Sequence, residues 1–269
     1  MSCQPNSRKL VYNWLTSKQS CLLCDERADG PQALCIPCER ELPWLSAACR
    51  ICALPLSDAN LLCGECLKQA PSFSRVETPW RYAFPLDSLI TRFKHQARWP
   101  LGRLLGELLA RHLRHAYLEG LPRPELLLPV PLARRRQRQR GFNQAALLAR
   151  WLATPLRLPV QEHWLLRPRE TDAQQTLDAR ARRRNLRHAF ELASRADVRG
   201  RHLALVDDVL TTGATCEALA RLLVTAGAAR VDVYCLARTP KPDSIESSVP
   251  TAAGPANAYT PSPFRPTAI

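Results

Sequence analysis

Two adjacent aspartates and a run of threonines form the segment whose chemistry is easiest to infer. Asp207 and Asp208 follow the apolar run 202–206, and the small residues Thr211, Thr212, Gly213, Ala214 and Thr215 come soon after them. Paired carboxylates are costly in a core, but they can bind ribose hydroxyls, directly or through Mg²⁺. A hydroxyl-rich loop that opens a helix presents backbone N–H groups to a phosphate. Helix capping would explain only one such residue, so the segment predicts a sugar-phosphate site.

Eight cysteines form four CxxC pairs, each beginning 14 residues after the one before. The pairs are Cys21/Cys24, Cys35/Cys38, Cys49/Cys52 and Cys63/Cys66. Two CxxC turns supply the four thiolates of a tetrahedral zinc site, so the pattern predicts two structural zinc ions. The short intervening loops favour sequential pairing, in which the first two pairs share one ion and the last two share the other. Spacing alone also allows the first pair to join the third and the second to join the fourth.

Arginines gather in two segments of the chain. The first contains Arg134, Arg135, Arg136, Arg138 and Arg140, and the second contains Arg180, Arg182, Arg183, Arg184 and Arg187. Guanidinium groups bind phosphate oxygens in a bidentate manner, and clustered like charges repel one another without an anionic partner. We therefore expect pyrophosphate, a nucleic-acid backbone or both at these segments, with a solvated charged loop as the alternative.

Strands that alternate with helices must position these residues. Apolar runs predict strands near 80–84, 125–131, 160–166, 202–206 and 230–236, whereas helical spacing predicts two helices within 86–117 and others at 142–152 and 217–226. This alternation is typical of a doubly wound α/β fold with a parallel sheet, which binds ligands beyond the carboxyl ends of its strands. We expect a linker at 71–80, a basic loop after 125–131 and a mobile loop at 168–188.

Length and composition fit one ordinary domain and a small module, because the chain has 269 residues, of which 46% are hydrophobic. We expect an amphipathic helix at 1–20, a double zinc ribbon at 21–70, the α/β domain at 80–239 and a disordered tail at 240–269. The net charge of +14 favours phosphate-bearing partners. The chain lacks an apolar run of membrane-spanning length and a signal-peptide pattern. Together with the CxxC pairs, this predicts a cytoplasmic protein without membrane insertion.

The run Leu203–Thr215 resembles the phosphoribosyl-pyrophosphate (PRPP) motif of type I phosphoribosyltransferases. That resemblance implies that Asp207 and Asp208 bind the ribose hydroxyls with Mg²⁺, and that Thr211 to Thr215 bind the 5′-phosphate. It also places the first arginine segment at the pyrophosphate loop and Arg182, Arg183 and Arg184 in a flexible loop that closes over PRPP.

From Cys21 to about Arg238, the chain is similar to the ComF (competence protein F) family, which includes GntX-like proteins. Besides the PRPP motif and the cysteines, the similarity rests on three motifs: Pro129-Val130-Pro131, Arg140-Gly141-Phe142-Asn143-Gln144, and Arg182-Arg183-Arg184-Asn185 before Ala189-Phe190. It implies a type I phosphoribosyltransferase-like parallel sheet with helices on both faces behind a double zinc ribbon. Lys94 and His95 resemble a two-residue step of the family, although we expect them to form an ordinary packed helix surface.

Two functions follow from the resemblance. The first is a role in natural transformation, in which the protein binds PRPP and Mg²⁺ and handles incoming single-stranded DNA with DNA-uptake proteins such as a helicase. The alternative is an active phosphoribosyltransferase of nucleotide metabolism, for which no acceptor site is recognisable in the sequence. A third reading, in which the zinc module docks a protein of the uptake machinery, stays open.

Overall fold

The computed structural model describes residues 19–28, 30–58, 61–168 and 189–241. Most of the expected N-terminal helix and nearly all of the expected tail lie outside these residues. Arg182, Arg183 and Arg184, like the rest of the second arginine segment, also lie outside them.

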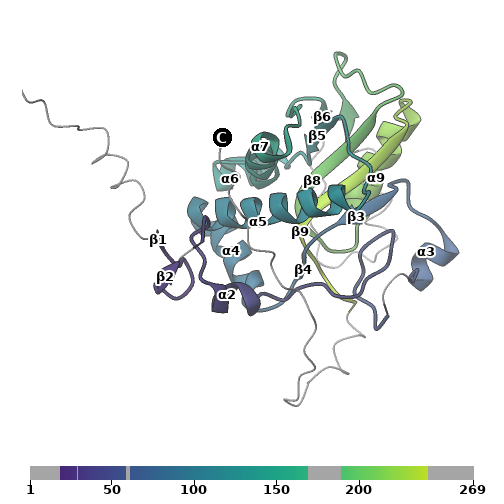
Figure 1. The fold of residues 1–269 in the computed structure, drawn as a ribbon. Helices are drawn as coiled ribbons and strands as arrows, with labels where there is room; N and C mark the ends of the chain where they lie inside the picture. Colours follow the sequence, from purple (N-terminus) through teal and green to yellow (C-terminus); the bar gives the residue numbers. More distant parts are fainter. Residues whose placement is uncertain (1–18, 29, 59–60, 169–188, 242–269) are drawn as a thin grey trace, which may run out of the picture.

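A parallel sheet forms the centre of the molecule (Figure 1). Its strand order is β3 (Arg75–Glu77), β9 (Arg230–Arg238), β8 (His202–Leu210) and β5 (Leu126–Pro129), and β4 (Trp80–Arg81) also pairs with β9. Every pairing in this sheet is parallel. The predicted α/β architecture is therefore confirmed.

Helices cover both faces of the sheet, which is why its two central strands are apolar along most of their length. Alternate residues of β8 face opposite sides. Ala204 and Val206 belong to the core beneath α4 (Leu86–Gln96), α5 (Trp99–Leu118) and α7 (Gln144–Leu156). Leu203 and Leu205 belong to the core beneath α9 (Ala214–Thr225). Polar residues lie instead at the end of the sheet where the strands have their carboxyl ends.

The two expected helices before and after Pro100 are present and pack tightly against each other. Ala97 ends α4 in the left-handed conformation, and Pro100 lies in the first turn of α5. A glycine at position 102 permits the close approach of α4, because a Cβ there would lie 2.5 Å from the Phe93 ring. Phe93 is fully buried, so α4 is held firmly at the end that carries Lys94.

Three expectations for the α/β domain need correction. The basic segment is not a loop but the short helix α6 (Arg134–Arg140). The expected linker contributes strand β3, because Val76 is buried and the segment pairs with β9. The expected strand 160–166 is interrupted by the polar residues 161–163: only Val160 bridges to Leu127, and β6 (Leu165–Leu166) pairs antiparallel with β7 (Glu191–Leu192).

The cysteine module contains little regular structure and packs along the sheet edge that carries β3 and β4 (Figure 1). It consists of the hairpin β1 (Gln19–Ser20) and β2 (Arg27–Ala28) and the short helices α2 (Ile36–Arg40) and α3 (Gly64–Lys68). Its first half shares a core with Trp80 and α5, and Glu39 pairs with Arg111. Its second half has a small core of its own, and the carbonyl of Ile51 in it accepts a hydrogen bond from the N–H of Val76.

Candidate functional site

Asp207 and Asp208 lie side by side within β8, which runs further than predicted, to Leu210. Asp208 is buried, and its Oδ1 lies 2.9 Å from the Nζ of Lys94 and accepts a hydrogen bond from the N–H of Val209. Its Oδ2 is also buried and has no hydrogen-bond partner among the described residues. Asp207 Oδ1 accepts the N–H of Asp208. A buried carboxylate oxygen without a partner is costly, which makes this pair a candidate for binding hydroxyls or a cation.

The environment of Asp207 shifts its acidity into the physiological range. Burial, followed by the neighbouring charge of Asp208, raises its pKa to about 7. The charge of Lys94 and the N–H of Asp208 oppose this shift only partly. The pair is therefore poised to change its net charge near neutral pH, a property common among functional carboxylates.

Lys94 belongs to the site, contrary to our expectation of an ordinary helix surface. It lies in the last turn of α4, where only 18% of its side chain is exposed. A signal was present in the sequence, because Lys94 follows the buried Ile90 by four positions and so shares its helix face. A lysine on the inward edge of an apolar helix face needs an acidic partner, and Asp208 is that partner.

The small residues after β8 form a tight loop that opens α9. Gly213 takes a left-handed conformation with φ 76° and occupies the N-cap position, and the N–H of Ala214 is donated to the Thr212 hydroxyl at 3.4 Å. Thr211 and Thr212 are exposed. The positive end of the α9 dipole and the loop's hydroxyls together offer a site for an anion.

Arg238, at the end of β9, fixes the orientation of this loop. Its Nη1 donates to the carbonyl oxygens of Leu210 and Thr211 and, at 2.8 Å, of Thr239. In a trans peptide the C=O and N–H point in opposite directions, so the N–H groups of Thr211 and Thr212 point away from Arg238. Arg238 is buried and has no carboxylate partner among the described residues, so its charge adds to the positive potential of the loop.

A small cationic pocket of about 250 Å³ adjoins the carboxylates through Lys94. Its lining includes His95, Arg136, Arg140 and Phe142. Burial, then the charges of Arg140 and Lys94, lowers the pKa of His95, so its ring is neutral at pH 7. The structure therefore brings Arg136 and Arg140 close to the carboxylates, whereas Arg134, Arg135 and Arg138 lie on the same helix outside this pocket.

The motif Arg140-Gly141-Phe142-Asn143-Gln144 connects α6 to α7 and sets the shape of this pocket. Gly141 ends α6 with φ 77°. Asn143 caps α7 by accepting the N–H of Ala145, and its Nδ2 donates to the carbonyl of Val130 after β5. Gly141 and Asn143 thus hold the arginine helix at the carboxyl end of the sheet.

The eight paired cysteines gather in two groups of four. Cys21, Cys24, Cys35 and Cys38 form one group, and Cys49, Cys52, Cys63 and Cys66 form the other, with the sulfur atoms of each group within 4.8 Å of one another. The Sγ distances Cys24–Cys35 and Cys52–Cys63 are both 3.6 Å, close to the roughly 3.8 Å expected around tetrahedral zinc. The sequential pairing is therefore the observed one, and crossed pairing is excluded.

Thiol acidity is uneven within each group, and the pKa values of Cys38 and Cys66 are raised by burial. Burial opposes ionisation, but backbone N–H groups, chiefly that of Cys35, lower the pKa of Cys21 to about 6. In the second group burial again opposes ionisation, while the N–H groups of Cys52 and Cys63 lower the pKa of Cys49 to about 7. Each group thus has one thiol that ionises readily and can start zinc binding.

Comparison with known proteins agrees with both modules. The double zinc ribbon domain family matches residues 11–67, and the phosphoribosyl transferase domain family matches residues 141–249. The chain is 40% identical over 227 residues to the DNA utilization protein YhgH of Escherichia coli O157:H7, covering 84% of this chain and 99% of that protein. It is 39% identical to competence protein F of Haemophilus influenzae, covering 76% of this chain and 90% of that protein.

The chain belongs to the competence protein F family. A more distant relative is the competence protein ComFC of Bacillus subtilis, which is 25% identical over 242 residues and covers 82% of this chain and 96% of that protein. Among solved structures, a purine phosphoribosyltransferase from Pyrococcus horikoshii matches with a TM-score of 0.31 and 18% identity over 50% of this chain and 70% of that one. The match to the phosphoribosyl transferase domain family and the parallel sheet covered by helices on both faces give a type I phosphoribosyltransferase-like fold, behind two Cys₄ zinc ribbons. No described helix combines the length and the apolar character of a membrane span.

Proposed function

We propose that this protein binds PRPP with Mg²⁺ and acts in DNA uptake, handling incoming single-stranded DNA in the cytoplasm. The observation that carries the proposal is the arrangement around Asp208: paired carboxylates, a threonine loop at a helix start and a cationic pocket meet at one edge of the sheet. PRPP carries matching groups, namely ribose hydroxyls, a 5′-phosphate and a pyrophosphate.

Each part of PRPP has a site of suitable chemistry. The ribose hydroxyls would donate to Asp207 and to the unpartnered Oδ2 of Asp208. The 5′-phosphate would accept from the outward N–H groups and hydroxyls of Thr211, Thr212 and Thr215. The pyrophosphate would lie against Lys94, Arg136 and Arg140, where guanidinium groups match its oxygens. Mg²⁺ prefers oxygen ligands and would offset the phosphate charge beside the carboxylates.

Isothermal titration of PRPP in the presence of Mg²⁺ tests this assignment. Asp208→Asn should weaken PRPP binding at least about tenfold, because it removes the charge that serves both the ribose and the metal. Glu162→Gln is a suitable control, because Glu162 pairs with Arg150 and lines neither pocket. Equal PRPP affinity in the wild type and Asp208→Asn would contradict the proposal.

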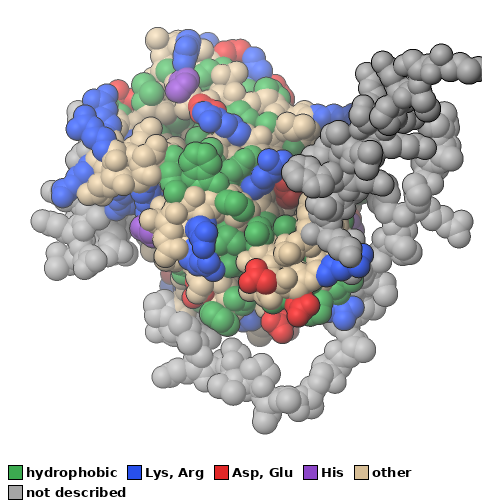
Figure 2. Space-filling model, turned by 90° about the vertical axis from the view of Figure 1, so that its left-hand side faces the viewer, with side chains coloured by type: hydrophobic (Ala, Val, Ile, Leu, Met, Phe, Trp, Pro, Cys, Tyr) green, Lys and Arg blue, Asp and Glu red, His purple; other side chains and the backbone are tan. Residues whose placement is uncertain are grey.

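The DNA role is supported by the names of the relatives and by the surface around α6. Lys and Arg side chains flank a hydrophobic area on the face in Figure 2, the side on which α4 and α6 lie in Figure 1. Trp99 is 52% exposed, and its ring meets that of Phe142 edge-on at 6.2 Å. Exposed aromatic rings beside cations are typical of surfaces that bind single-stranded nucleic acid without sequence preference.

The alternative is an active phosphoribosyltransferase, and one observation favours it: a large cavity adjoins the threonine loop. Such an enzyme would release pyrophosphate when PRPP and an acceptor are supplied together. Release that depends on Asp207 and Asp208 would establish catalysis. If PRPP binds but no nucleobase or nucleoside causes pyrophosphate release, the result would favour the binding role in DNA uptake over catalysis.

A further inference from the structure

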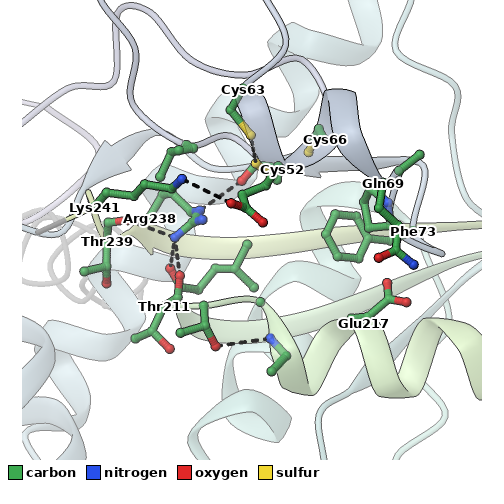
Figure 3. A pocket seen from close by; sticks show the side chains of 18 of the residues that line it. Cys52, Cys63, Cys66, Gln69, Phe73, Thr211, Glu217, Arg238, Thr239 and Lys241 are labelled. Carbon is green, nitrogen blue, oxygen red and sulfur yellow. Dashed lines mark hydrogen bonds and ion pairs between the residues drawn. The ribbon is translucent and has the colours of Figure 1, made fainter. Parts of the chain in front are cut away.

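A cavity of about 740 Å³ lies between the second zinc ribbon and the threonine loop (Figure 3). One wall consists of ribbon residues from Cys52 to Phe73, and the other consists of the loop Leu210–Ala214 with the start of α9. The end of β9 and the residues after it, Arg238 to Lys241, close one side. The volume falls within the usual range of small-ligand sites, roughly 300–1,000 Å³.

This cavity is distinct from the carboxylate site, although both share the threonine loop. Asp207, Asp208 and Lys94 do not line it, whereas Leu210, Thr211 and Thr212 do. A ligand in the cavity would thus lie beside a sugar phosphate bound at the carboxylates, with the loop between them. A second ligand group next to the first is what a group-transfer site or a strand-binding site requires.

Three contacts hold the walls of the cavity in place. Arg238 Nε donates to the carbonyl of Cys52 at 2.9 Å while its Nη1 holds the loop, so a single side chain joins ribbon and loop (Figure 3). Ser72 donates its N–H and its hydroxyl to the carboxylate of Glu217 on α9 at 2.7 and 2.9 Å. Lys241 lies 3.7 Å from Glu65 of the ribbon. The cavity is therefore preformed and does not depend on closure around a ligand.

The lining indicates what kind of group fits. Leu54, Pro71 and Phe73 give it apolar surface, and charged side chains of both signs also line it. The cavity is lined by four cationic side chains, of Lys68, Arg221, Arg238 and Lys241, and by the carboxylates of Glu65 and Glu217. A zinc ion held by four thiolates would add a net charge of about −2, so the summed charge of the walls is close to zero. A balance near zero favours a neutral ring, and the N–H groups of such a ring can donate to the carboxylates of the lining. A nucleobase has this combination of a flat apolar face and N–H donors.

We propose that the cavity binds a nucleobase, carried by a free nucleoside or by a nucleotide within a single strand, and that the second zinc ribbon is a wall of this site. That the nucleobase lies beside a sugar phosphate rests on the proposed function, but nucleobase binding itself can be tested separately. It also explains why no acceptor segment is recognisable in the sequence. The site is assembled from residues 52–73 and 210–241, which are far apart in the chain.

Filling the cavity tests the proposal. Ala70 is exposed at the cavity wall, so Ala70→Trp adds a large ring there without disturbing a core. Leu118→Trp is the matched control, because Leu118 is 88% exposed on α5 and does not line the cavity. The probes are deoxyadenosine, thymidine and a ten-nucleotide single strand, titrated with each variant, and PRPP with Mg²⁺ in parallel.

We expect Ala70→Trp to weaken binding of a base-bearing probe at least tenfold and to leave PRPP binding within twofold, whereas Leu118→Trp changes neither. If Ala70→Trp weakens binding of the nucleosides, the ligand is a free nucleoside. If it weakens binding of the single strand alone, the ligand is a base within a strand. The proposal is overturned if no base-bearing probe binds, if Ala70→Trp has no effect, or if it weakens PRPP equally. Failure of PRPP binding in the wild type, with a base-bearing probe still sensitive to Ala70→Trp, would reject the proposed function alone.

Discussion

At the scale of single residues, the site depends on charges that are only partly neutralised. Asp208 has one oxygen paired with Lys94 and one without a partner among the described residues. Arg238 is buried against backbone carbonyls, and no described carboxylate pairs with it. Such arrangements are costly in the free protein and become favourable when a ligand supplies the missing partner. The free oxygen of Asp208 is therefore available to a ligand, whereas Arg238 holds the loop in place through its hydrogen bonds to backbone carbonyls.

The pKa of Asp207 predicts a pH dependence of ligand binding. Because this pKa is about 7, the carboxyl is mostly protonated at pH 6 and mostly ionised at pH 8. Only the ionised form binds Mg²⁺ well, so the affinity for Mg²⁺ and PRPP should rise by several-fold to about tenfold between pH 6 and pH 8. Titration calorimetry at the two pH values measures this change. Asp207→Asn should bind more weakly and show a flatter profile, and an unchanged slope would refute the assignment.

The same shift predicts how stability varies with pH. A carboxyl whose pKa is raised on folding stays protonated in the folded state at pH values where it is already ionised in the unfolded chain. Its contribution to the free energy of unfolding therefore falls as pH rises from about 4 to about 7, and is constant above that range. Urea denaturation of the wild type and Asp207→Asn should show the variant gaining relative stability from pH 5 to pH 8. A stability difference that is the same at both pH values would contradict the raised pKa.

At the scale of secondary-structure elements, α4 is the element that delivers Lys94 to the carboxylates, and its position depends on Gly102 of α5. Gly102→Ala should destabilise the fold by roughly 1–3 kcal/mol, because the added Cβ would overlap the buried Phe93 ring. Gly106→Ala on the same helix is the control. Its Cβ would lie 3.4 Å from Trp151, so it should cost less and can gain from helix propensity. Urea denaturation of the three proteins gives the comparison, and equal stabilities would contradict the packing argument.

The helix α6 is short, fully exposed or nearly so, and carries no acidic residue. Arginines four positions apart on it repel one another, so an anionic partner should stabilise it. Replacing Arg136 and Arg140 by Gln should weaken single-stranded DNA binding and reduce the slope of log affinity against log salt by about 1 to 2. Fluorescence anisotropy at several salt concentrations measures the slope. Arg103→Gln on α5 removes a charge outside both pockets and serves as control; an equal change of slope there would argue against a specific role for α6.

The sequence predicted the elements with strong periodicity and missed those that depend on tertiary contacts. The strands of the sheet centre and the helices around it follow from apolar runs. Strand β3 has only three residues and lies between Pro71 and Pro79, and it exists because β9 is available to pair with it. The arginine run was expected to be a loop because it follows a strand that ends in prolines. Its helical form depends on the cap at Gly141 and on the anchoring of Asn143 to the end of β5.

The site itself was predicted in part, for a similar reason. Asp207, Asp208 and the threonine loop are consecutive, so their proximity follows from the sequence alone. Lys94 and Arg238 reach them from other elements, and the roles of both depend on packing that spacing does not encode. The spacing of the cysteines allowed two ways of pairing the CxxC turns around the zinc ions. The positions of the sulfur atoms distinguish between them.

At the scale of the whole molecule, the two zinc ribbons have different neighbours and should make different contributions. The first packs on α5 through a shared core, whereas the second is joined to the threonine loop through Arg238. Cys52→Ser with Cys66→Ser should lower zinc content from two ions to one per chain and weaken ligand binding at the loop at least several-fold. Cys24→Ser with Cys38→Ser should remove one ion with a smaller effect on binding. Elemental analysis with calorimetry tests both, and equal losses of affinity would contradict the asymmetry.

The pairing of β3 with β9 has a consequence for folding during synthesis on the ribosome. The edge strand lies at residues 75–77, while its partner lies at 230–238, so the first must wait for the synthesis of some 150 further residues. Each ribbon, by contrast, closes within 18 residues and can take up metal soon after it emerges. Contacts so distant along the chain form late, since a long loop must be closed first. On the nascent polypeptide, metal loading therefore comes first and closure of the sheet comes last.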